Sequence, residues 1–386
     1  VALLFSQGWS PGGNDLYSPT FIPDSVAKPL LVWALYFFLN RLKTHSFLLI
    51  GFATLFQPLM GFQMFVLVGL SDLIGNRNIL NSAKNTIAYM LAGGWLFGVL
   101  MISYFSGVSE VEMPQLFEIY FGFRAPHHFL PSYFMGAYSY VFFLVLGLAL
   151  LYFYDRLPEI FWFLIVLLVG CIVYAVGVEV FHSTTIASTQ WFKVTQWAKI
   201  FLLLFFFDKA RPFLKSIENY ILKPWIVLGG FVSLVVLIFL YWAPNYHPLH
   251  KPNDLVQKSS NSLMYEYVKN YTPVDACFVI PFQNSDFKHG ARRSVYVDFK
   301  SVDPGADFMM LWKPRMDAVY GVPNLDSDKG FNFEVKANEF YKRLNYNNLL
   351  SLKNDGVTHL LTKWPITNSA LKLAWNNDVY YIYEYQ

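Results

Sequence analysis

The stretch Ser46–Leu70, which reads SFLLIGFATLFQPLMGFQMFVLVGL, decides the fold of the apolar part of this chain. It is long enough for one helical crossing of a bilayer, whose hydrocarbon is about 30 Å thick. Pro58 interrupts it, because proline cannot donate the backbone hydrogen bond of a helix interior. Basic residues flank the stretch on both sides, namely Arg41, Lys43, Arg77 and Lys84. Since basic loops stay on the cytoplasmic side, we expect a re-entrant hairpin of two short helices that turns near Pro58.

Six other apolar stretches are candidate transmembrane helices, of which the first in chain order is shorter than the rest and adequate if Lys28 extends to the membrane interface. They are Ser25–Leu39, Asn85–Phe105, Met135–Tyr154, Ile160–Val180, Trp191–Phe207 and Pro224–Trp242. With the hairpin in place, the basic loops all fall on the inner side, and Arg124 is the one basic residue in the outer loops between helices. A single crossing at Ser46–Leu70 would instead leave the basic loop Asp208–Lys223 outside. The pattern predicts a polytopic α-helical membrane protein with about six transmembrane helices, a re-entrant hairpin and an outer C-terminal part.

Composition divides the chain into two parts. It is 55% hydrophobic and only 14% charged, against about 25% charged in soluble domains. The first 243 residues hold 24 charged residues and the last 143 hold 31, so we expect a transmembrane domain over 1–243 and a soluble domain over 244–386. Cys171 and Cys277 fall on opposite sides of this division, which excludes a disulfide between them. The net charge of +3, without any Lys/Arg run, argues against nucleic-acid binding.

The C-terminal part alternates helical and strand patterns from residue 261 onward. Helices are predicted at Ser262–Asn270, Pro304–Val319 and Phe333–Leu344, and strands at Cys277–Pro281, Ser294–Asp298, Val357–Thr362 and Asp378–Tyr385. Gly356 follows an apolar helical run and precedes a strand, as at a helix C-terminus. The result is a small α/β domain. It has no glycine-rich phosphate loop after a strand, so a nucleotide site has little support.

An outer loop carries the first candidate binding residues. It reads Arg124-Ala-Pro-His127-His128-Phe-Leu-Pro-Ser132. An arginine and two histidines that converge at the membrane surface would suit an anionic head group, because the guanidinium offers a planar fork to phosphate oxygens. Adjacent histidines do not share one face of a regular element, so we expect no metal site made of both. A loop held at the interface by its two prolines is the equally weighted alternative.

A second set lies on the helix predicted at Trp191–Phe207. Lys193 and Gln196 share a face of it at i, i+3 spacing. A buried lysine is paired or binds an anion, and Glu179 and His182, just before this helix, are candidate partners. A structural ion pair and a phosphate-binding lysine remain equal alternatives.

Two carboxylates precede the first helix. Asp15 is expected on the outer side, where it could act as a base or hold a divalent metal ion. Asp24 follows a proline and fits better as a helix N-cap. A charged run, Arg292–Lys300, marks a predicted strand in the outer domain, with docking onto the membrane part favoured over ligand binding.

Several motifs together resemble a family of uncharacterised bacterial membrane proteins similar in layout to GT-C glycosyltransferases. They are Arg-x-Pro-His-His from Arg124, the Gln57-Pro58 break, Gln-Trp-Phe-Lys-x-Thr from Gln190, Thr-Pro-x-Asp-Ala from Thr272, Arg-Ser-x-Tyr-Val-Asp-Phe-Lys from Arg293 and Gly-Val-Thr-His from Gly356. GT-C enzymes transfer sugar from a polyprenyl-phosphate carrier at the outer face of the membrane. Their catalytic carboxylate lies in the first outer loop, and since this chain begins with Val1 inside an apolar stretch, we expect an incomplete N-terminus.

The resemblance implies a GT-C type glycosyltransferase in the bacterial inner membrane, with its C-terminal domain in the periplasm. A polyprenyl-phosphate-linked sugar would be held by Arg124, His127, His128, Lys193, Gln196, Glu179 and His182, and Asp15 would activate the acceptor. The alternative is a non-catalytic subunit of a larger membrane complex that docks through its outer domain. A transporter ranks third, because the helices show no internal repeat.

Overall fold

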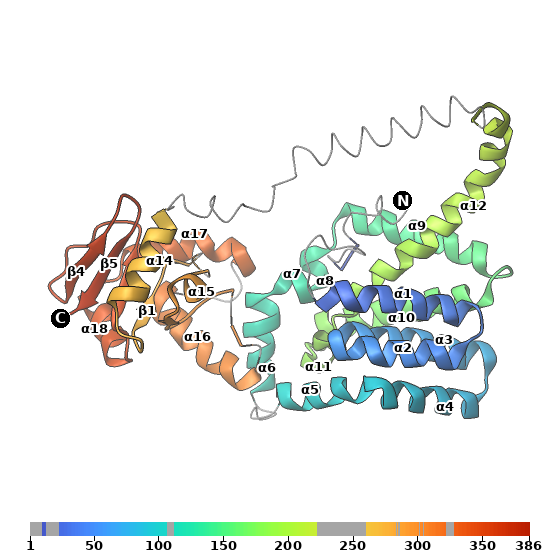
Figure 1. Ribbon diagram of the computed structural model, residues 1–386, viewed down its shortest axis with the longest axis horizontal. Helices are drawn as coiled ribbons and strands as arrows, with labels where there is room; N and C mark the ends of the chain where they lie inside the picture. The colour runs from blue at the N-terminus through green and yellow to red at the C-terminus, as the bar shows by residue number, and fades with distance from the viewer. Residues whose placement is uncertain are drawn as a thin grey trace. The chain divides into compact units, whose positions relative to one another are not determined.

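The computed structural model describes residues 10–12, 23–105, 112–221, 260–282, 284, 286–300, 302–303, 305–321 and 328–386. By its contacts the chain divides into two units (Figure 1). A helical unit comprises Val1–Phe207, Asp303–Leu311 and Asn324–Asn332, and a sheet unit comprises Asp208–Val302, Trp312–Pro323 and Phe333–Gln386. The domain boundary expected between residues 243 and 244 lies outside the described residues.

The helical unit consists of long apolar helices joined by short turns. Its elements are α1 (Pro23–Leu39), α2 (Lys43–Phe56), α3 (Pro58–Asn76), α4 (Ile79–Tyr89), η1 (Met90–Gly94), α5 (Trp95–Phe105), α6 (Met113–Leu116), η2 (Phe117–Arg124), α7 (Pro126–Phe129), α8 (Pro131–Phe134), α9 (Ala137–Phe153), α10 (Pro158–Glu179), α11 (Thr184–Ser188), η3 (Trp191–Val194) and, up to Phe207, α12 (Thr195–Ile221). The core is aromatic and aliphatic, and α1, α2, α3 and α10 contribute most of its buried side chains.

The hairpin predicted from Ser46–Leu70 is present as α2 and α3. α2 ends at Phe56, Gln57 leaves the helical conformation, and α3 begins at Pro58. Proline suits the first position of a helix, because the amide hydrogen there has no partner inside the helix. The chain therefore reverses where the sequence predicts. However, α3, at 19 residues, is long and apolar enough to cross a membrane by itself, so it is not the short re-entrant arm expected.

Contacts along both arms show that they run antiparallel. Near the turn, a Cβ atom on Gly61 would lie 2.2 Å from Oγ1 of Thr54, so only glycine allows the arms this close. At the far end, Nζ of Lys43 lies 2.7 Å from Oδ1 of Asp72. α1 packs antiparallel to α2 in the same way, because its first turn lies at the hairpin turn.

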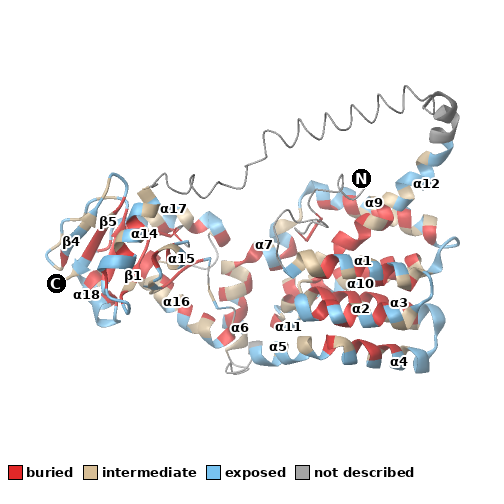
Figure 2. Cartoon of the chain, in the orientation of Figure 1, coloured by how far each residue is buried: buried red, intermediate tan, exposed pale blue. Residues whose placement is uncertain are grey.

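Three helical segments among the described residues are long and apolar enough to cross a membrane: Pro58–Asn76, Ile79–Ser103 and Pro158–Glu179. The second of these is mostly exposed (Figure 2), and the exposed fractions of Leu91 and Ile102 are 80% and 76%. Apolar side chains that face outward along a whole helix are stable in lipid and unfavourable in water. The helical unit therefore has the surface of a membrane protein.

Two predicted spans have different bounds in the structure. Ala137–Phe153 is an apolar helix of 17 residues, shorter than the span predicted there. The helix that begins at Thr195 continues past Phe207 to Ile221, so the loop predicted from Asp208 is helical over that range. Lys209, Ala210 and Arg211 are strong helix formers, which explains the continuation. The predicted span Pro224–Trp242 lies outside the described residues.

The sheet unit is a mixed α/β fold. Its elements are α14 (Ser260–Tyr271), β1 (Cys277–Val279), α15 (Phe287–Ala291), β2 (Ser294–Val295), the part of α16 (Ala306–Tyr320) from Trp312 on, α17 (Glu334–Lys342), α18 (Tyr346–Asn354), β3 (His359–Thr362), β4 (Leu371–Asn376) and β5 (Tyr381–Tyr385). The first residues of α16, and η5 (Gly330–Phe333) up to Asn332, group with the helical unit. The strand order is β2-β1-β3-β5-β4. β1 is parallel to both β2 and β3, whereas β5 is antiparallel to β3 and β4.

Most predicted elements of this unit are present, and Gly356 has the positive φ of 90° expected after α18. The strand predicted at Ser294–Asp298 is much shorter, because it ends at Val295. Asp298 is instead buried, with Lys288 3.6 Å away, and its main-chain oxygen accepts a hydrogen bond from Trp312. Strand β4 and the short helix α15 carry no clear alternating or helical pattern and were not predicted.

Candidate functional site

The turn of the α2–α3 hairpin brings polar side chains to one end of the helical unit. Nε2 of Gln57, at the turn, donates a 2.7 Å hydrogen bond to Oδ1 of Asp24. The other oxygen of Asp24 lies 3.3 Å from Nζ of Lys28, one helical turn along α1. Asp24 lies inside the first turn of α1, so the N-cap predicted for it is replaced by this contact with the hairpin. Neither Lys28 nor Gln57 was predicted as part of a site.

The segment between α11 and α12 brings Lys193 to the same end. The side chain of Gln63, on α3, donates to the carbonyl oxygens of Thr189 (2.7 Å) and Gln190 (3.1 Å) and so fixes this segment. Lys193 then lies where the charges of Asp24 and Lys28 act on it. It forms no ion pair with any residue that the structure describes. The buried lysine predicted at the mouth of this helix is therefore close to α1.

The Arg124–Ser132 loop forms the third part of the site. It consists of the end of η2 and the single-turn helices α7 and α8, each of which begins with proline. The guanidinium of Arg124 lies over the ring of Tyr120, 5.4 Å from its centroid. The hydroxyl of Tyr174, on α10, lies within hydrogen-bonding distance of the carbonyls of Phe129 (3.0 Å) and Ala187 (3.2 Å). Tyr174 thus ties the histidine loop to the loop before Lys193.

The rings of His127 and His128 lie against each other, with centroids 4.1 Å apart and planes tilted by 43°. The expectation that adjacent histidines do not share one face was wrong, because the single turn of α7 leaves the two rings in contact. Burial lowers the pKa of His127, and the charges of Arg124 and Lys193 lower it further. Part of the His128 ring reaches the surface, yet burial, His127, Lys193 and Arg124 lower its pKa to about 4. Both rings are therefore neutral at pH 7, in a field of positive charge.

This charge distribution suits an anion better than a metal ion. Lysine and arginine lie beside the histidines, and their positive charge repels a cation. Within the described ranges no group of three or more His, Cys, Asp or Glu side chains is close enough to hold a metal. Asp15, the candidate catalytic residue and metal ligand, lies outside the described residues. What the arrangement offers is donors: the guanidinium of Arg124, the ammonium of Lys193 and two imidazole N–H groups.

Glu179 and His182 do not pair with Lys193 as predicted. The carboxylate of Glu179 accepts a 2.7 Å hydrogen bond from the backbone N–H of Ser132 and so supports the histidine loop from α10. The His182 ring packs on Phe117, with centroids 5.1 Å apart. Both residues shape the loops around the site. Sequence proximity suggested an ion pair, but the turn after α10 directs these side chains toward η2 and α8.

Gln196 differs from these residues in its hydrogen bonding. It is fully buried, and neither its amide nitrogen nor its amide oxygen has a hydrogen-bond partner among the described residues. The Nε1 of Trp197 next to it is also buried without an acceptor there. Buried polar groups normally have hydrogen-bond partners. The first turn of α12, which follows Lys193, therefore holds donors and acceptors that remain available to a polar ligand group.

A cavity of about 280 Å³ with a mostly apolar wall and a few polar side chains adjoins the hairpin turn. Its wall includes Gln57 and Gln190, together with aromatic rings from η2 and α7 such as Tyr120 and Phe129. Oε1 of Gln190 is buried without a donor among the described residues. The cavity therefore lies between the histidine loop and the hydrogen bond from Gln57 to Asp24.

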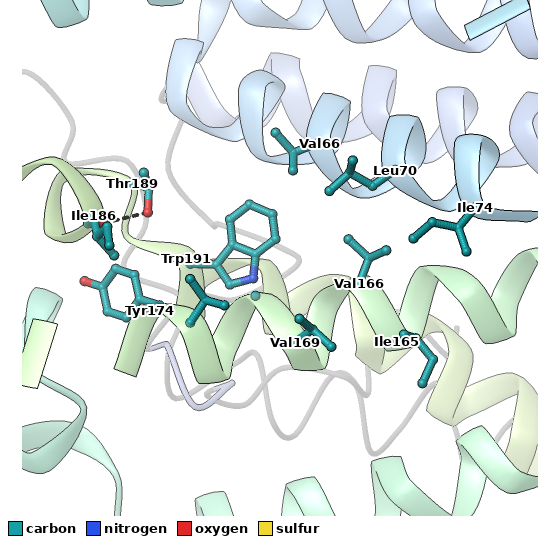
Figure 3. A pocket seen from close by; sticks show the side chains of 12 residues that line it. Val66, Leu70, Ile74, Ile165, Val166, Val169, Tyr174, Ile186, Thr189 and Trp191 are labelled. Atoms are coloured by element: carbon teal, nitrogen blue, oxygen red, sulfur yellow. Dashed lines mark hydrogen bonds between the residues drawn. The ribbon is translucent and has the colours of Figure 1, made fainter. Parts of the chain in front are cut away.

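A second cavity, of about 390 Å³, is almost wholly apolar and lies between α3 and α10 (Figure 3). The indole of Trp191 stands between Val66 and Leu70 on one side and Val166 and Val169 on the other. Leu70 and Val169 are 43% and 52% exposed, so the cavity opens sideways along the helices. Its wall ends at Trp191, two residues before Lys193. The apolar groove therefore lies next to the group Arg124, His127, His128 and Lys193, which we call the cationic cluster.

Comparison with known proteins adds little on function. Residues 261–319, in the sheet unit, match a family described as a domain of unknown function (DUF6798). No curated protein matches the chain. The matched segment covers α14 to α16 and includes no residue of the cationic cluster.

Proposed function

We propose that the helical unit binds the phosphate of a polyprenyl-phosphate-linked sugar and acts as a GT-C-like glycosyltransferase. The observation that carries this proposal is the cationic cluster of Arg124, His127, His128 and Lys193 beside the apolar groove between α3 and α10. A polyprenyl phosphate has the same two parts, an anionic head and a long apolar chain. The membrane would be the bacterial inner membrane, with the cluster on its periplasmic side.

In this proposal the groups divide their work. Arg124 and Lys193 donate to the phosphate oxygens, and Trp191 guides the first isoprene units into the groove. The charge of Asp24 acts on Lys193, and together with Asp15 it is a candidate base for the acceptor hydroxyl. Transfer breaks the bond between the sugar and the phosphate, leaves the phosphate on the lipid and moves the hydroxyl proton to the carboxylate.

The test uses the full chain in lipid nanodiscs and a polyprenyl-phosphate-linked glucose as probe. We expect R124A and K193A each to weaken binding about tenfold or more, since each removes a charge-assisted hydrogen bond. Lys84→Ala is the matched control, because Lys84 is an exposed lysine of α4 outside the cluster. The corresponding free polyprenol should bind more weakly than the phosphate ester.

Unchanged binding in the R124A/K193A double variant would refute the proposal. Copurification of a stoichiometric membrane complex, with both variants silent, would support the alternative of a non-catalytic subunit. If binding responds as expected, Asp24→Asn separates binding from transfer, because it should leave binding within about threefold and stop consumption of the labelled donor.

A further inference from the structure

The sheet unit has a cavity of its own, of about 420 Å³. It is lined by Pro281, Glu334, Asn338, Lys342, Lys363 and Trp364. Pro281 follows β1 by two residues, and Lys363 and Trp364 follow β3 directly. All six residues belong to the sheet unit. The cavity therefore lies at the carboxyl ends of two neighbouring parallel strands.

The strand order makes this position special. From β1 the chain proceeds to β2, on one side, whereas from β3 it proceeds to β4 and β5, on the other side. Connections that leave neighbouring parallel strands in opposite directions open a crevice between their carboxyl ends. In open α/β sheets this crevice is where ligands bind. The topology thus selects the edge at which this cavity lies.

Helix α17 supplies the opposite wall. Glu334, Asn338 and Lys342 follow one another at four-residue spacing, so they lie along one face of the helix. The hydroxyl of Tyr341 fixes this helix to the sheet, because it lies 2.7 Å from the carbonyl of Leu361 in β3 and 3.3 Å from that of Val279 in β1. Burial keeps the pKa of Tyr341 well above its ordinary value, so the hydroxyl remains a donor.

The side chains in the cavity have capacity to bind a ligand. Nε1 of Trp364 is buried and has no acceptor among the described residues, although a buried donor normally has one. Nζ of Lys342 lies 5.2 Å from the centre of the Trp364 ring, and Lys363 lies near the Tyr380 ring. Neither lysine forms an ion pair with a described residue. Two ammonium groups, an indole N–H and the amide of Asn338 therefore converge on one space, opposite a single carboxylate.

We propose that this cavity binds a saccharide unit that carries a carboxylate or phosphate group. The two lysines take the anionic group, and Asn338 and Glu334 hydrogen-bond the sugar hydroxyls. Nε1 of Trp364 donates to a ring or hydroxyl oxygen. The volume is within the range of small-molecule pockets, roughly 300–1,000 Å³. The inference uses no residue of the helical unit, so it stands or fails independently of the proposed glycosyltransferase activity.

The test is saturation-transfer difference NMR on the full chain in nanodiscs. The probes are glucuronic acid, glucose 1-phosphate, glucose and inorganic phosphate. We expect both acidic sugars to bind, and glucose and inorganic phosphate to bind at least about tenfold more weakly, because each lacks half of the recognised groups. K342M/K363M should weaken the acidic sugars about tenfold or more, and W364F should weaken them by a smaller factor. Lys372→Met is the matched control, since Lys372 is exposed on β4.

Several results would overturn the proposal. One is an acidic sugar bound equally well by the wild type and by K342M/K363M. Another is inorganic phosphate bound as tightly as glucose 1-phosphate, which would mean a simple anion site. If the double lysine variant fails to fold, W364F with unchanged sugar binding would be decisive against it, because this substitution keeps an aromatic ring in place.

Discussion

The two ends of the α2–α3 hairpin differ in how their charged side chains are arranged. At the open end, the ammonium of Lys43 lies 2.7 Å from Asp72, whose carboxylate also accepts a hydrogen bond from Asn76, and Asp72 is only 5% exposed. At the turn end, an ion pair between Lys28 and Asp24 lies beside two histidines, and the charges of Arg124 and Lys193 lower the pKa of both rings. Charges at the open end cancel one another. At the turn end, two positive charges act on the same pair of imidazole rings.

This difference separates structural from functional charge. A paired, buried charge stabilises a helix contact and leaves no capacity for a ligand, whereas converging like charges cost stability unless an anion joins them. The sequence alone shows basic residues at both ends. Only the contacts show that Lys43 and Lys28 each have a carboxylate partner within the fold.

The strongest way to break the comparison is to remove the partner at the open end. Asp72→Leu leaves the Lys43 ammonium without its carboxylate, and we expect a loss of about 3 kcal/mol or more in the free energy of unfolding. Unfolding of the purified protein in micelles with increasing SDS measures it. The double variant K43M/D72L should recover most of the loss, because two apolar side chains can replace a buried pair.

Ligand binding provides the contrast for this prediction. D72L should leave the affinity for the polyprenyl phosphodiester within about twofold of the folded wild type, since Asp72 lies at the far end of α3. A large loss of affinity in folded D72L protein would mean that the two ends are coupled, and the division of roles would be wrong.

The next largest effect concerns the groove that leads to the turn end. A Cβ atom on Gly170 would lie 2.1 Å from Nε1 of Trp191. Gly170→Ala must therefore displace the indole, at a cost of about 1–3 kcal/mol, and should weaken binding of the polyprenyl chain. Gly147→Ala is the matched control, because Gly147, in α9, has nothing within 4 Å of such an atom. Equal stability of the two variants would contradict the packing described for Trp191.

The hairpin, the small α/β domain and the convergence of Arg124 with Lys193 could be predicted from sequence. Proline and flanking charge act locally, and their consequences can be read from a single stretch. When loops are assigned to one side of the membrane from their charge, residues far apart in the sequence are predicted to lie at the same end of the helices. This prediction needs no knowledge of side-chain packing. Spans 85–105 and 160–180 follow from apolar length for the same reason.

The partners of individual side chains could not be predicted. Glu179 precedes Lys193 closely in sequence, yet it binds Ser132, because the turn after α10 decides its direction. Asp24 has the sequence context of a cap, and only the position of Gln57 in the folded hairpin makes it part of the site. The cavity beside Trp364 depends on strand order, which no local pattern encodes.

A smaller expected effect is the pH dependence of ligand affinity at the turn end of the hairpin. Because the pKa of His127 is lowered and that of His128 is about 4, the free site holds neutral rings at pH 7. A bound phosphodiester raises both pKa values, so binding takes up protons and affinity rises as pH falls from about 7 toward 4. We expect a gain below about tenfold for each histidine. Affinity measured over this range should become flat in H127Q/H128Q, and a wild type without any rise would contradict the assignment.

The smallest expected effect concerns a second, exposed ion pair at the open end of the hairpin. Arg41 and Glu159 form a second ion pair there, 3.3 Å apart, but the Arg41 side chain is 80% exposed. Water screens such a pair, so Arg41→Gln should change the free energy of unfolding by less than about 0.5 kcal/mol. Glu159 also lies in the first turn of α10, where a carboxylate is stabilised by the helix dipole by about 0.3–1 kcal/mol. Glu159→Gln should therefore cost more than Arg41→Gln. Equal losses of stability in the two variants, both abolished by salt, would assign the whole effect to the ion pair. Burial would then be a weaker criterion for structural charge than Asp72 suggests.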